Sequence, residues 1–170
     1  MSSGEIIEAE TVAVQLVVTL AARGQTVATA ESLTGGLVAG ALTDVPGASA
    51  VYVGGVVSYA THAKEELLAV SPEVIEGAGV VSAACVEAMA RGVRRLLGTT
   101  YGVATTGVAG PDEQEGKPVG TVFIGLAGPG GVTSVALRLG GDRRAIRAAT
   151  VEAALALLRE QVPREEPRLG

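Results

Sequence analysis

The chain contains only two lysines, and the position of one of them suggests a chemical role. Among 13 basic residues, Lys64 and Lys117 are the lysines and all others are arginines. A lysine ammonium can lose its proton once it is desolvated and then act as a base, whereas an arginine guanidinium stays protonated. Lys64 follows Tyr59 closely and lies downstream of Ser32. These residue types predict a serine nucleophile whose general base is a lysine rather than a histidine.

Ser32 lies in the segment Ala30–Gly36, where a buried strand is expected to give way to a helix. Sheets of α/β proteins bind ligands at such crevices, and backbone N–H groups beside the serine could hold an oxyanion or a phosphate. The alternative is that Ser32 or Thr34 only caps the helix. The segment matches neither the G-x-S-x-G nucleophile elbow nor the GK[ST] phosphate loop. Ser32 is therefore a candidate nucleophile, with helix capping as the competing interpretation.

Lys64 also has a competing interpretation, that of an exposed helix lysine beside two glutamates. If Tyr59 ends a strand, Lys64 lies in the first turns of the following helix, and both side chains can face the crevice. Desolvation there would lower the pKa of Lys64 enough for it to accept a serine proton. His62 is the only histidine, so a Ser-His-Asp triad would require it. We expect His62 at the surface or at the rim of the crevice instead.

Two further positions could contact a substrate. Thr106 and Gly107 follow an apolar strand and predict a substrate-binding rim, and the polar loop 112–117 comes next. The acids of that loop lack the regular spacing of metal ligands, so we expect a solvated, mobile loop and no metal site. Arg143 begins a helix and is suited to bidentate binding of a phosphate or carboxylate, with plain surface charge as the alternative.

The elements that must position these residues are helices and strands in alternation. Helices are predicted over 5–23, 32–43, 64–68, from 71, over 82–97 and over 142–161, with Ser82 and Asp142 as the caps of the last two. Strands are predicted over 26–30, 51–59, 101–105, 119–127 and 132–139. Gly54 and Gly55 interrupt the second strand, where a bulge or a close backbone approach is expected. The order predicts an α/β fold, a single three-layer α/β/α domain with a mixed sheet and helices on both faces, over 1–162. A charged, flexible tail is expected at 163–170.

Composition argues against several classes of protein. The net charge of −5 and the four aromatic residues speak against a nucleic-acid partner. A single cysteine, Cys85, excludes an intramolecular disulfide and a multi-cysteine zinc site, and we expect it to be buried. No uncharged apolar run reaches transmembrane length, and the N-terminus lacks the basic start of a signal peptide. We therefore expect a soluble cytoplasmic protein with no membrane partner.

Seven short segments and Lys64 together resemble the C-terminal domain of the CinA (competence/damage-inducible) family. The segments are Ala30–Gly36, Val45–Ser49, Gly54–Tyr59, Gly79–Ser82, Thr106–Pro111, Lys117–Gly120 and Gly141–Arg143. They come in the family's order, and the resemblance covers about residues 5–160. The chain departs from the family at Leu33, where members often carry cysteine.

Enzymatic members of this family are nicotinamide mononucleotide deamidases, and the resemblance implies the same activity here. Ser32 would be the nucleophile, Lys64 the general base and Tyr59 the residue that orients the pair. The reaction would give nicotinate mononucleotide and ammonia through an acyl-enzyme, without a cofactor or a metal. The sequence leaves two biological roles open, pyridine nucleotide salvage for NAD metabolism and a role tied to competence. The residues implied in substrate binding are Thr34, Gly35, Gly36, Ser49, Thr106, Gly107 and Arg143.

The implied partner is a small-molecule nucleotide, and a homo-oligomer is expected from the family and from the common preference for symmetric assemblies. Two other interpretations stay open. The domain could be a nucleotide-binding module without catalysis, in which the backbone near Ser32 and the Arg143 side chain hold a phosphate. It could also be an amidase with the same mechanism that acts on a different substrate.

Overall fold

The computed structural model describes residues 3–162, and the tail predicted at 163–170 lies outside the described residues. Within that range, helices and strands alternate largely as the sequence predicts. The elements are α1 (Ser3–Arg23), β1 (Val27–Glu31), α2 (Leu37–Thr43), the 3₁₀ helix η1 (Ala48–Ala50), β2 (Tyr52–Val57), α3 (Thr61–Leu68), α4 (Pro72–Gly77), α5 (Ala83–Leu97), β3 (Tyr101–Gly107), β4 (Thr121–Gly128), β5 (Gly131–Arg138) and α6 (Arg143–Gln161).

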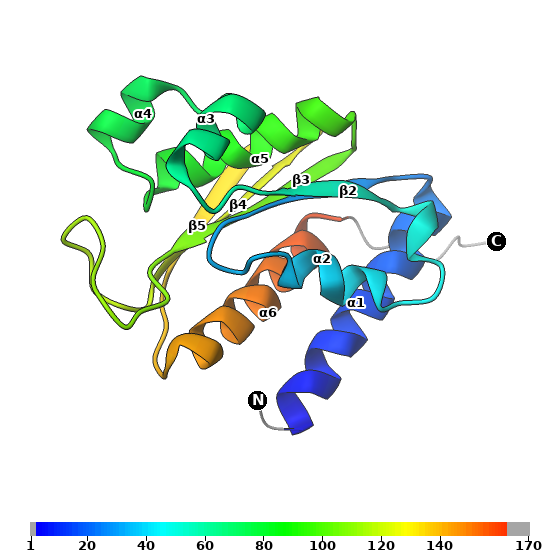
Figure 1. The fold of residues 1–170 in the computed structure, drawn as a ribbon. Helices are drawn as coiled ribbons and strands as arrows, with labels where there is room; N and C mark the ends of the chain where they lie inside the picture. The colour runs from blue at the N-terminus through cyan, green and yellow to red at the C-terminus, as the bar shows by residue number, and fades with distance from the viewer. Residues whose placement is uncertain (1–2, 163–170) are drawn as a thin grey trace.

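The five strands form one mixed sheet in the order β2-β1-β3-β4-β5. β1 runs parallel to both β2 and β3, whereas β4 and β5 continue the sheet in antiparallel fashion. Helices α3, α4 and α5 lie on one face of the sheet, and α1, α2 and α6 lie on the other (Figure 1). The predicted α/β fold, with a mixed sheet between two helical layers, is therefore confirmed.

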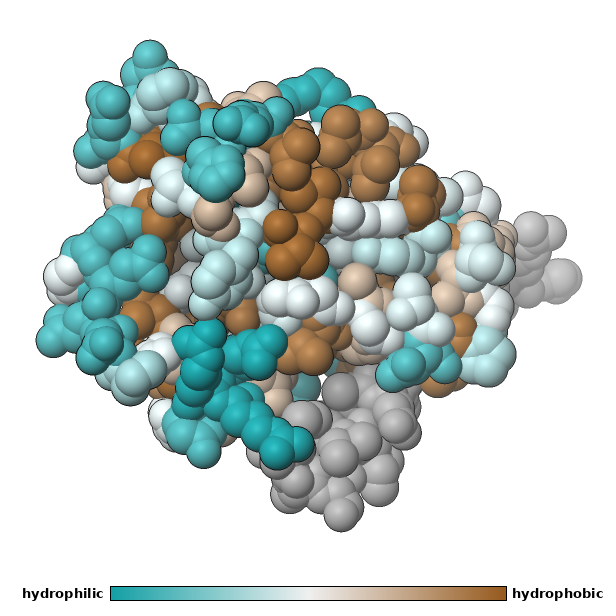
Figure 2. Space-filling view, in the orientation of Figure 1, coloured by the Kyte–Doolittle hydropathy of each residue, from teal (hydrophilic) through white to brown (hydrophobic). Residues whose placement is uncertain are grey.

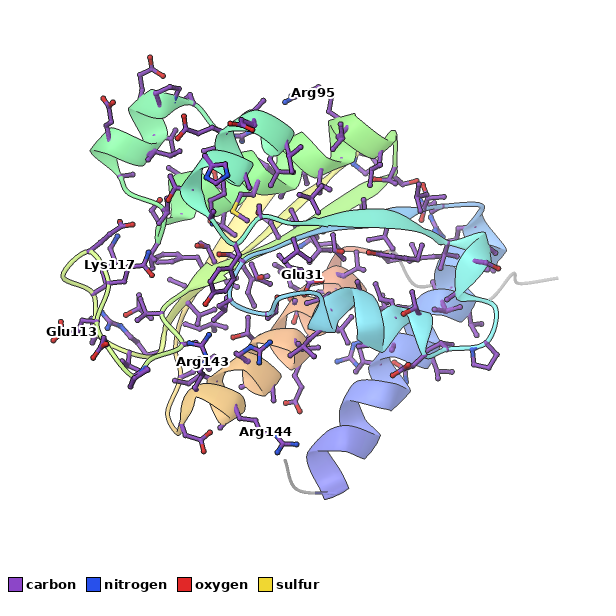
Figure 3. The ribbon with its side chains drawn as sticks, in the orientation of Figure 1. Glu31, Arg95, Glu113, Lys117, Arg143 and Arg144 are labelled. Carbon is purple, nitrogen blue, oxygen red and sulfur yellow. The ribbon has the colours of Figure 1, made fainter. Side chains whose placement is uncertain are left out.

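The central strand β1 is buried along its whole length, and its side chains alternate between two apolar cores. Val27 belongs to the core shared with α1, α2 and α6. Ala28 and Ala30 belong to the core on the side of α5. By the same alternation Glu31, the last residue of β1, lies on the α2 side of the sheet (Figure 3). This position explains how an acid at a strand end comes to be buried beside a helix start.

The start of α2 differs from the prediction, because the helix begins at Leu37 rather than at 32–34. Gly35 and Gly36 have φ values of 56° and 103°, in the left-handed region that a right-handed helix cannot include. Residues 32–36 therefore form a turn between β1 and α2. The other predicted caps are confirmed, since Ser82 accepts a hydrogen bond from the Cys85 N–H and Asp142 accepts one from the Ala145 N–H.

A bulge or a close backbone approach was predicted at Gly54 and Gly55, and the structure contains both. The β1–β2 register shifts between Val27 and Ala28, which pair with Tyr52 and Gly54. A Cβ atom on Gly55 would lie 2.4 Å from the Thr29 Oγ1 atom, so only glycine permits this approach. The close packing brings the end of β2, and the residues that follow it, beside the end of β1.

β2 forms one edge of the sheet and carries exposed apolar side chains, Val53 and Val57 among them. Figure 2 shows hydrophobic side chains gathered around the region of β2 and α3, where Leu67 is also exposed. None of the helices within residues 3–162 combines the length and the apolar character needed to cross a membrane.

Candidate active site

The candidate site lies where the three parallel strands end. Ser32 directly follows β1, Tyr59 follows β2, and Thr106 and Gly107 close β3. Because parallel strands end at the same edge of a sheet, these residues meet there. A cavity of about 220 Å³ opens at this edge, and its lining consists of Ser32, Leu33, Tyr59, Thr61, Lys64, Val80, Val81, Thr106, Gly107, Val108, Ala109, Gly110, Asp112, Gln114 and Arg143. The structure therefore brings together six of the residues predicted from the sequence.

Lys64 reaches this cavity from α3 with a side chain that is only 2% exposed. Its Nζ atom lies 3.0 Å from the Ser32 Oγ atom, 2.6 Å from the carbonyl oxygen of Ser58 and 3.4 Å from that of Tyr59. All three contacts are made with uncharged groups. Lys64 is thus a buried amine in direct contact with a serine hydroxyl.

Burial is the main influence on the charge of Lys64, and it lowers the pKa of the ammonium below the usual 10.5. Negative charge on Cys85 or Glu115 would act in the opposite direction. Burial also raises the pKa of the Cys85 thiol to about 11, so Cys85 is a neutral thiol near pH 7. Desolvation of the ammonium therefore dominates, and the environment favours the neutral amine that a general base requires.

The turn that carries Ser32 is held by a buried carboxylate. Glu31, which is 1% exposed, accepts hydrogen bonds from the Thr34 hydroxyl at 2.6 Å, from the Val38 N–H at 2.8 Å and from the Ala39 N–H at 3.1 Å. The side chain of Glu31 thus fills the place of a cap at the start of α2. The Val38 and Ala39 donors are therefore occupied by the protein's own carboxylate, and the expectation that N–H groups beside Ser32 hold an oxyanion or a phosphate stays a prediction.

β3 fixes the same turn from its other side. The Ser32 N–H donates to the carbonyl oxygen of Thr105 at 3.1 Å, and the hydroxyl groups of Thr34 and Thr105 lie 2.8 Å apart. Thr34 is fully buried and its hydroxyl is committed to Glu31 and Thr105. The backbone of the candidate nucleophile is therefore tied into the sheet and does not depend on a substrate for its position.

Arg143 and Tyr59 form the exposed rim of the cavity. The Arg143 guanidinium donates to the Tyr59 hydroxyl at 3.0 Å and to the carbonyl oxygen of Gly110 at 2.6 Å. Figure 3 shows Arg143 at the start of α6, on the side of the cavity. The Tyr59 hydroxyl thus meets Arg143, and only the backbone carbonyl of Tyr59 contacts Lys64. The Tyr59 side chain thus lies at the rim of the cavity, and its role in orienting the Ser32–Lys64 pair stays a prediction.

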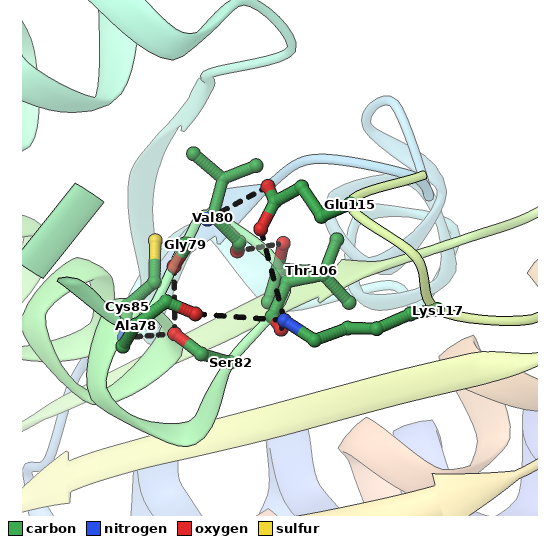
Figure 4. Close-up of polar contacts among 9 residues, drawn as sticks. Ala78, Gly79, Val80, Ser82, Cys85, Thr106, Glu115 and Lys117 are labelled. Atoms are coloured by element: carbon green, nitrogen blue, oxygen red, sulfur yellow. Dashed lines mark hydrogen bonds and ion pairs between the residues drawn. The ribbon is translucent and has the colours of Figure 1, made fainter. Parts of the chain in front are cut away.

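The loop between β3 and β4 supplies Asp112 and Gln114 to the cavity lining. Residues 115 and 117 of this loop form hydrogen bonds with residues 80 and 81, which precede α5 (Figure 4). Glu115 accepts a hydrogen bond from the Val80 N–H at 2.9 Å, and Lys117 donates to the carbonyl oxygen of Val81. The loop predicted to be solvated and mobile therefore has two specific anchors. Among residues 12–162, whose side chains the structure describes, no group of three or more His, Cys, Asp or Glu side chains is arranged to hold a metal ion.

A sequence model described as the CinA C-terminal domain matches residues 9–162, nearly the whole described chain. The chain belongs to the CinA C-terminal domain family. A CinA-like protein of Frankia casuarinae is 56% identical over 143 residues, which are 84% of this chain and 33% of the relative. A putative competence-damage inducible protein of Desulforamulus reducens is 52% identical over 78% of this chain and 32% of its own length. The chain thus spans about a third of the length of these curated relatives.

Solved structures of CinA proteins have the same fold. The competence/damage inducible protein CihA from Agrobacterium tumefaciens has a TM-score of 0.87 and 38% identity, over 90% of this chain and 94% of that one. A CinA superfamily protein from Klebsiella pneumoniae has a TM-score of 0.88 and 35% identity, over 91% of this chain and 97% of the other. The five-stranded sheet and its two helical layers are therefore the CinA fold.

Four residues predicted to bind substrate lie outside the lining of the cavity in this CinA domain. Thr34 is buried in the turn, and Gly35 and Gly36 give the turn its left-handed conformation. Ser49 is exposed on η1, which follows α2. A direct role in substrate binding stays a prediction for these residues, and His62 lies exposed on α3 as expected.

Sequence reasoning did not find several residues that shape the site. Glu31 precedes Ser32 directly, and an acid at the end of a buried strand was a signal that it needed partners. Arg147 of α6 donates to the carbonyl oxygens of Leu33 and Thr34, and only the fold reveals this contact. Ser58 is fully buried with a hydroxyl that has no partner among the described residues, and nothing in the sequence indicates this.

Proposed function

We propose that this CinA domain is an amide hydrolase that deamidates nicotinamide mononucleotide to nicotinate mononucleotide and ammonia. The observation that carries the proposal is the 3.0 Å contact between Lys64 Nζ and Ser32 Oγ, made by a lysine that is 2% exposed. A serine needs an adjacent base to become a nucleophile, and a desolvated amine is such a base. The identity of the substrate rests on the resemblance to the enzymatic members of the family.

The contacts of Lys64 suit the neutral amine. A neutral amine has two N–H bonds and one lone pair. In the ammonium form Nζ donates to all three oxygens; in the neutral form its two hydrogens go to the carbonyl oxygens of Ser58 and Tyr59, and its lone pair accepts the hydroxyl proton of Ser32. Lys64 in this state holds Ser32 in the orientation from which the proton can be transferred.

In the first half of the reaction, Ser32 Oγ forms a bond to the carboxamide carbon of the substrate while its proton moves to Lys64 Nζ. The C=O π electrons move to oxygen and give a tetrahedral oxyanion. When this intermediate collapses, the C–N bond breaks, and the amide nitrogen takes the proton from Lys64 and leaves as ammonia. In the second half, a water molecule gives a proton to Lys64 and attacks the ester, and Ser32 Oγ recovers that proton as nicotinate mononucleotide departs.

Polar groups around the cavity fit a small nucleotide. Arg143 lies at the rim with a guanidinium suited to a phosphate. Asp112 and Gln114 lie on the adjacent loop, with oxygen and amide groups that could bind ribose hydroxyls. Apolar side chains such as Val80 and Val108 also line the cavity, and they could pack against a pyridine ring.

Ammonia release from nicotinamide mononucleotide by the purified, metal-free protein tests the proposal. We expect turnover by the parent, and Ser32→Ala and Lys64→Ala should each reduce kcat by about 10⁴-fold or more. His62→Ala is the matched control and should leave turnover unchanged, because His62 is exposed outside the cavity lining. Binding of the nucleotide without any turnover would contradict the proposal and favour a binding module.

Nicotinamide riboside tests the substrate class, because it lacks the phosphate. If Arg143 holds the phosphate in the ground state and in the transition state alike, the riboside should show a raised KM and a similar kcat. An equal kcat/KM for riboside and mononucleotide would exclude the nucleotide as the preferred substrate. The amidase mechanism would survive that result with a different substrate.

A further inference from the structure

The turn that carries Ser32 has backbone donors that its own chain leaves unused. The Ser32 N–H donates to the carbonyl oxygen of Thr105, and the Gly35 N–H donates to that of Ser32, each at 3.1 Å. The N–H groups of Leu33 and Thr34 have no hydrogen-bond partner within residues 3–162. Of these two residues only Leu33 lines the cavity, and it is 4% exposed. An unpaired N–H in so buried a residue is uncommon in proteins and points to a ligand as its partner.

A guanidinium lies behind this turn, on the α6 side of the sheet. Arg147 donates from Nε to the carbonyl oxygen of Leu33 at 2.9 Å and from Nη2 to that of Thr34 at 3.3 Å. A trans peptide unit has its C=O and its N–H on opposite edges. A donor that holds the carbonyl therefore also fixes the direction in which the N–H of the same peptide points.

Two peptide units connect Arg147 to the cavity in series. The carbonyl of Thr34, held by Arg147, shares its peptide unit with the Gly35 N–H, which donates to the carbonyl of Ser32. The carbonyl of Ser32 in turn shares its peptide unit with the Leu33 N–H. Each hydrogen bond in such a chain polarises the next, and the first donor here carries a full positive charge. The Leu33 N–H is thus the terminal donor of an oriented and polarised chain.

We propose that the Leu33 N–H binds the oxyanion of the reaction, and that Arg147 is the positioning residue that orients and polarises this donor through the two peptide units. The inference rests on the proposed amidase function and deepens it. When Ser32 attacks, the carboxamide oxygen takes up negative charge beside the nucleophile, and Leu33 is the adjacent residue in the turn. Donors fixed in advance toward that oxygen stabilise the transition state more than the ground state.

Gly35 also shapes the turn that Arg147 contacts. It has a φ of 56°, and a Cβ atom there would lie 3.4 Å from the Arg147 Nη2 atom. That distance is an ordinary van der Waals contact, so glycine is favoured here by the left-handed φ of the turn rather than by the space beside the guanidinium. The side chain of Arg147 thus contacts the turn on one side, and strand β3 contacts it on the other.

Steady-state kinetics of Arg147→Ala and Arg147→Lys test the inference, with Arg144→Ala as the matched control. Arg144 lies on the same helix, is exposed and points away from the cavity (Figure 3). We expect Arg147→Ala to lower kcat by about tenfold to a hundredfold with KM nearly unchanged, which is less than the loss of a direct oxyanion donor. Arg147→Lys should recover part of the loss, because an ammonium can hold only one carbonyl in place. Circular dichroism and Tm show whether each variant is folded.

The thioamide analogue of nicotinamide mononucleotide separates this role from a merely structural one. Its intermediate places the negative charge on sulfur, a larger and weaker hydrogen-bond acceptor than oxygen. The ratio of kcat for the amide over kcat for the thioamide should therefore fall in Arg147→Ala relative to the parent. A loss of the same size for both substrates, or a kcat within twofold of the parent, would overturn the inference.

A parent that releases no ammonia would refute the proposed function and not this inference. In that case the rate at which a fluorophosphonate modifies Ser32 decides, since its P=O oxygen occupies the position of the oxyanion. Slower modification in Arg147→Ala than in Arg144→Ala would support the role of Arg147. Equal rates would overturn it.

Discussion

The two walls of the cavity are held in different ways. The turn that carries Ser32 is fixed by Glu31, whose carboxylate is 1% exposed and accepts three hydrogen bonds. The loop of residues 111–118 is fixed by Glu115 and Lys117, whose side chains are each 30% exposed and lie 3.7 Å apart. Charged hydrogen bonds are strong when they are buried and weak when water competes for them. We call the turn of residues 31–36 the nucleophile wall and the loop of residues 111–118 the loop wall. The nucleophile wall is therefore rigid, whereas the loop wall can detach from the rest of the fold at a small cost in free energy.

This difference matches what each wall must do. In the proposed amidase, proton transfer between Ser32 and Lys64 requires a fixed geometry, because a small misplacement of reacting groups costs a large factor in rate. In the proposed function the loop wall binds the ribose, which does not react, and it must let substrate enter and product leave. We therefore expect changes in the nucleophile wall to alter kcat and stability, and changes in the loop wall to alter KM.

Lys64→Met should have the largest effect, a loss of kcat by about 10⁴-fold or more, because methionine is similar in length and cannot accept a proton. The pH dependence of stability should change as well. The folded parent has a lowered Lys64 pKa and binds fewer protons than the unfolded chain, so its stability rises with pH between that pKa and 10.5. Urea unfolding at several pH values should show a rise of up to about 1.4 kcal/mol per pH unit in the parent, absent in Lys64→Met. Parallel curves would contradict a lowered pKa.

The pH profile of kcat/KM is the next prediction. Only the neutral form of Lys64 accepts the Ser32 proton, so kcat/KM should rise about tenfold per pH unit and level off above the pKa of Lys64. Burial lowers that pKa, so the plateau should begin well below 10.5. His62→Ala should give the same profile. A profile that still rises at pH 10, or one that loses its acid limb in His62→Ala, would rule out Lys64 as the base.

Glu31→Ala should destabilise the fold by about 3 kcal/mol, since it leaves two N–H groups of α2 without their acceptor and removes one of the two partners of the Thr34 hydroxyl. Glu31→Gln retains one oxygen acceptor and should cost less, about 1–2 kcal/mol. Chemical denaturation measures both values, and kcat at 25 °C should fall together with stability. If Glu31→Ala were as stable as Glu31→Gln, the turn would not depend on this carboxylate.

Periodicity and cap signals in the sequence predicted most of the fold, because these signals are local. Ser82 and Asp142 cap their helices as expected, and Gly55 makes the close approach that its place in a strand predicted. The predicted start of α2 was wrong because the predicted helix over 32–43 included Gly35 and Gly36. Their left-handed φ values end any helix at that point, and a sequence does not state φ.

The pairing of Ser32 with Lys64 was also predicted, although the scarcity of lysine pointed to it only in part. Resemblance to a family supplied the pairing, and the contact itself depends on the fold, which brings Lys64 of α3 to the residue that follows β1. Arg147 could not have been found in this way, because it lies more than 110 residues from the carbonyls that it holds. Long-range contacts between a polar side chain and a backbone carbonyl have no signature in a single sequence.

Glu115→Ala should have the smallest effect on turnover and stability, and it tests the loop wall. Loss of a partly exposed charged hydrogen bond should raise KM about threefold to tenfold and leave kcat within twofold, with stability changed by less than about 1 kcal/mol. Because the charge of Glu115 raises the pKa of Lys64, its removal should also move the acid limb of kcat/KM to lower pH. Lys117→Met should raise KM without that shift. If Glu115→Ala instead lowered kcat and left KM unchanged, the loop would belong to the reacting centre.

Gly79→Ala provides an independent way to release the same loop. A Cβ atom on Gly79 would lie 1.8 Å from Glu115 Oε2, so the carboxylate must leave its position beside Val80. The φ of Gly79 is 84°, so the substitution should also cost about 1–2 kcal/mol of stability, unlike Glu115→Ala. In the double variant Gly79→Ala/Glu115→Ala, the effects on KM should not add, because both changes remove one contact. Additive effects would show that Gly79 and Glu115 act on the cavity separately.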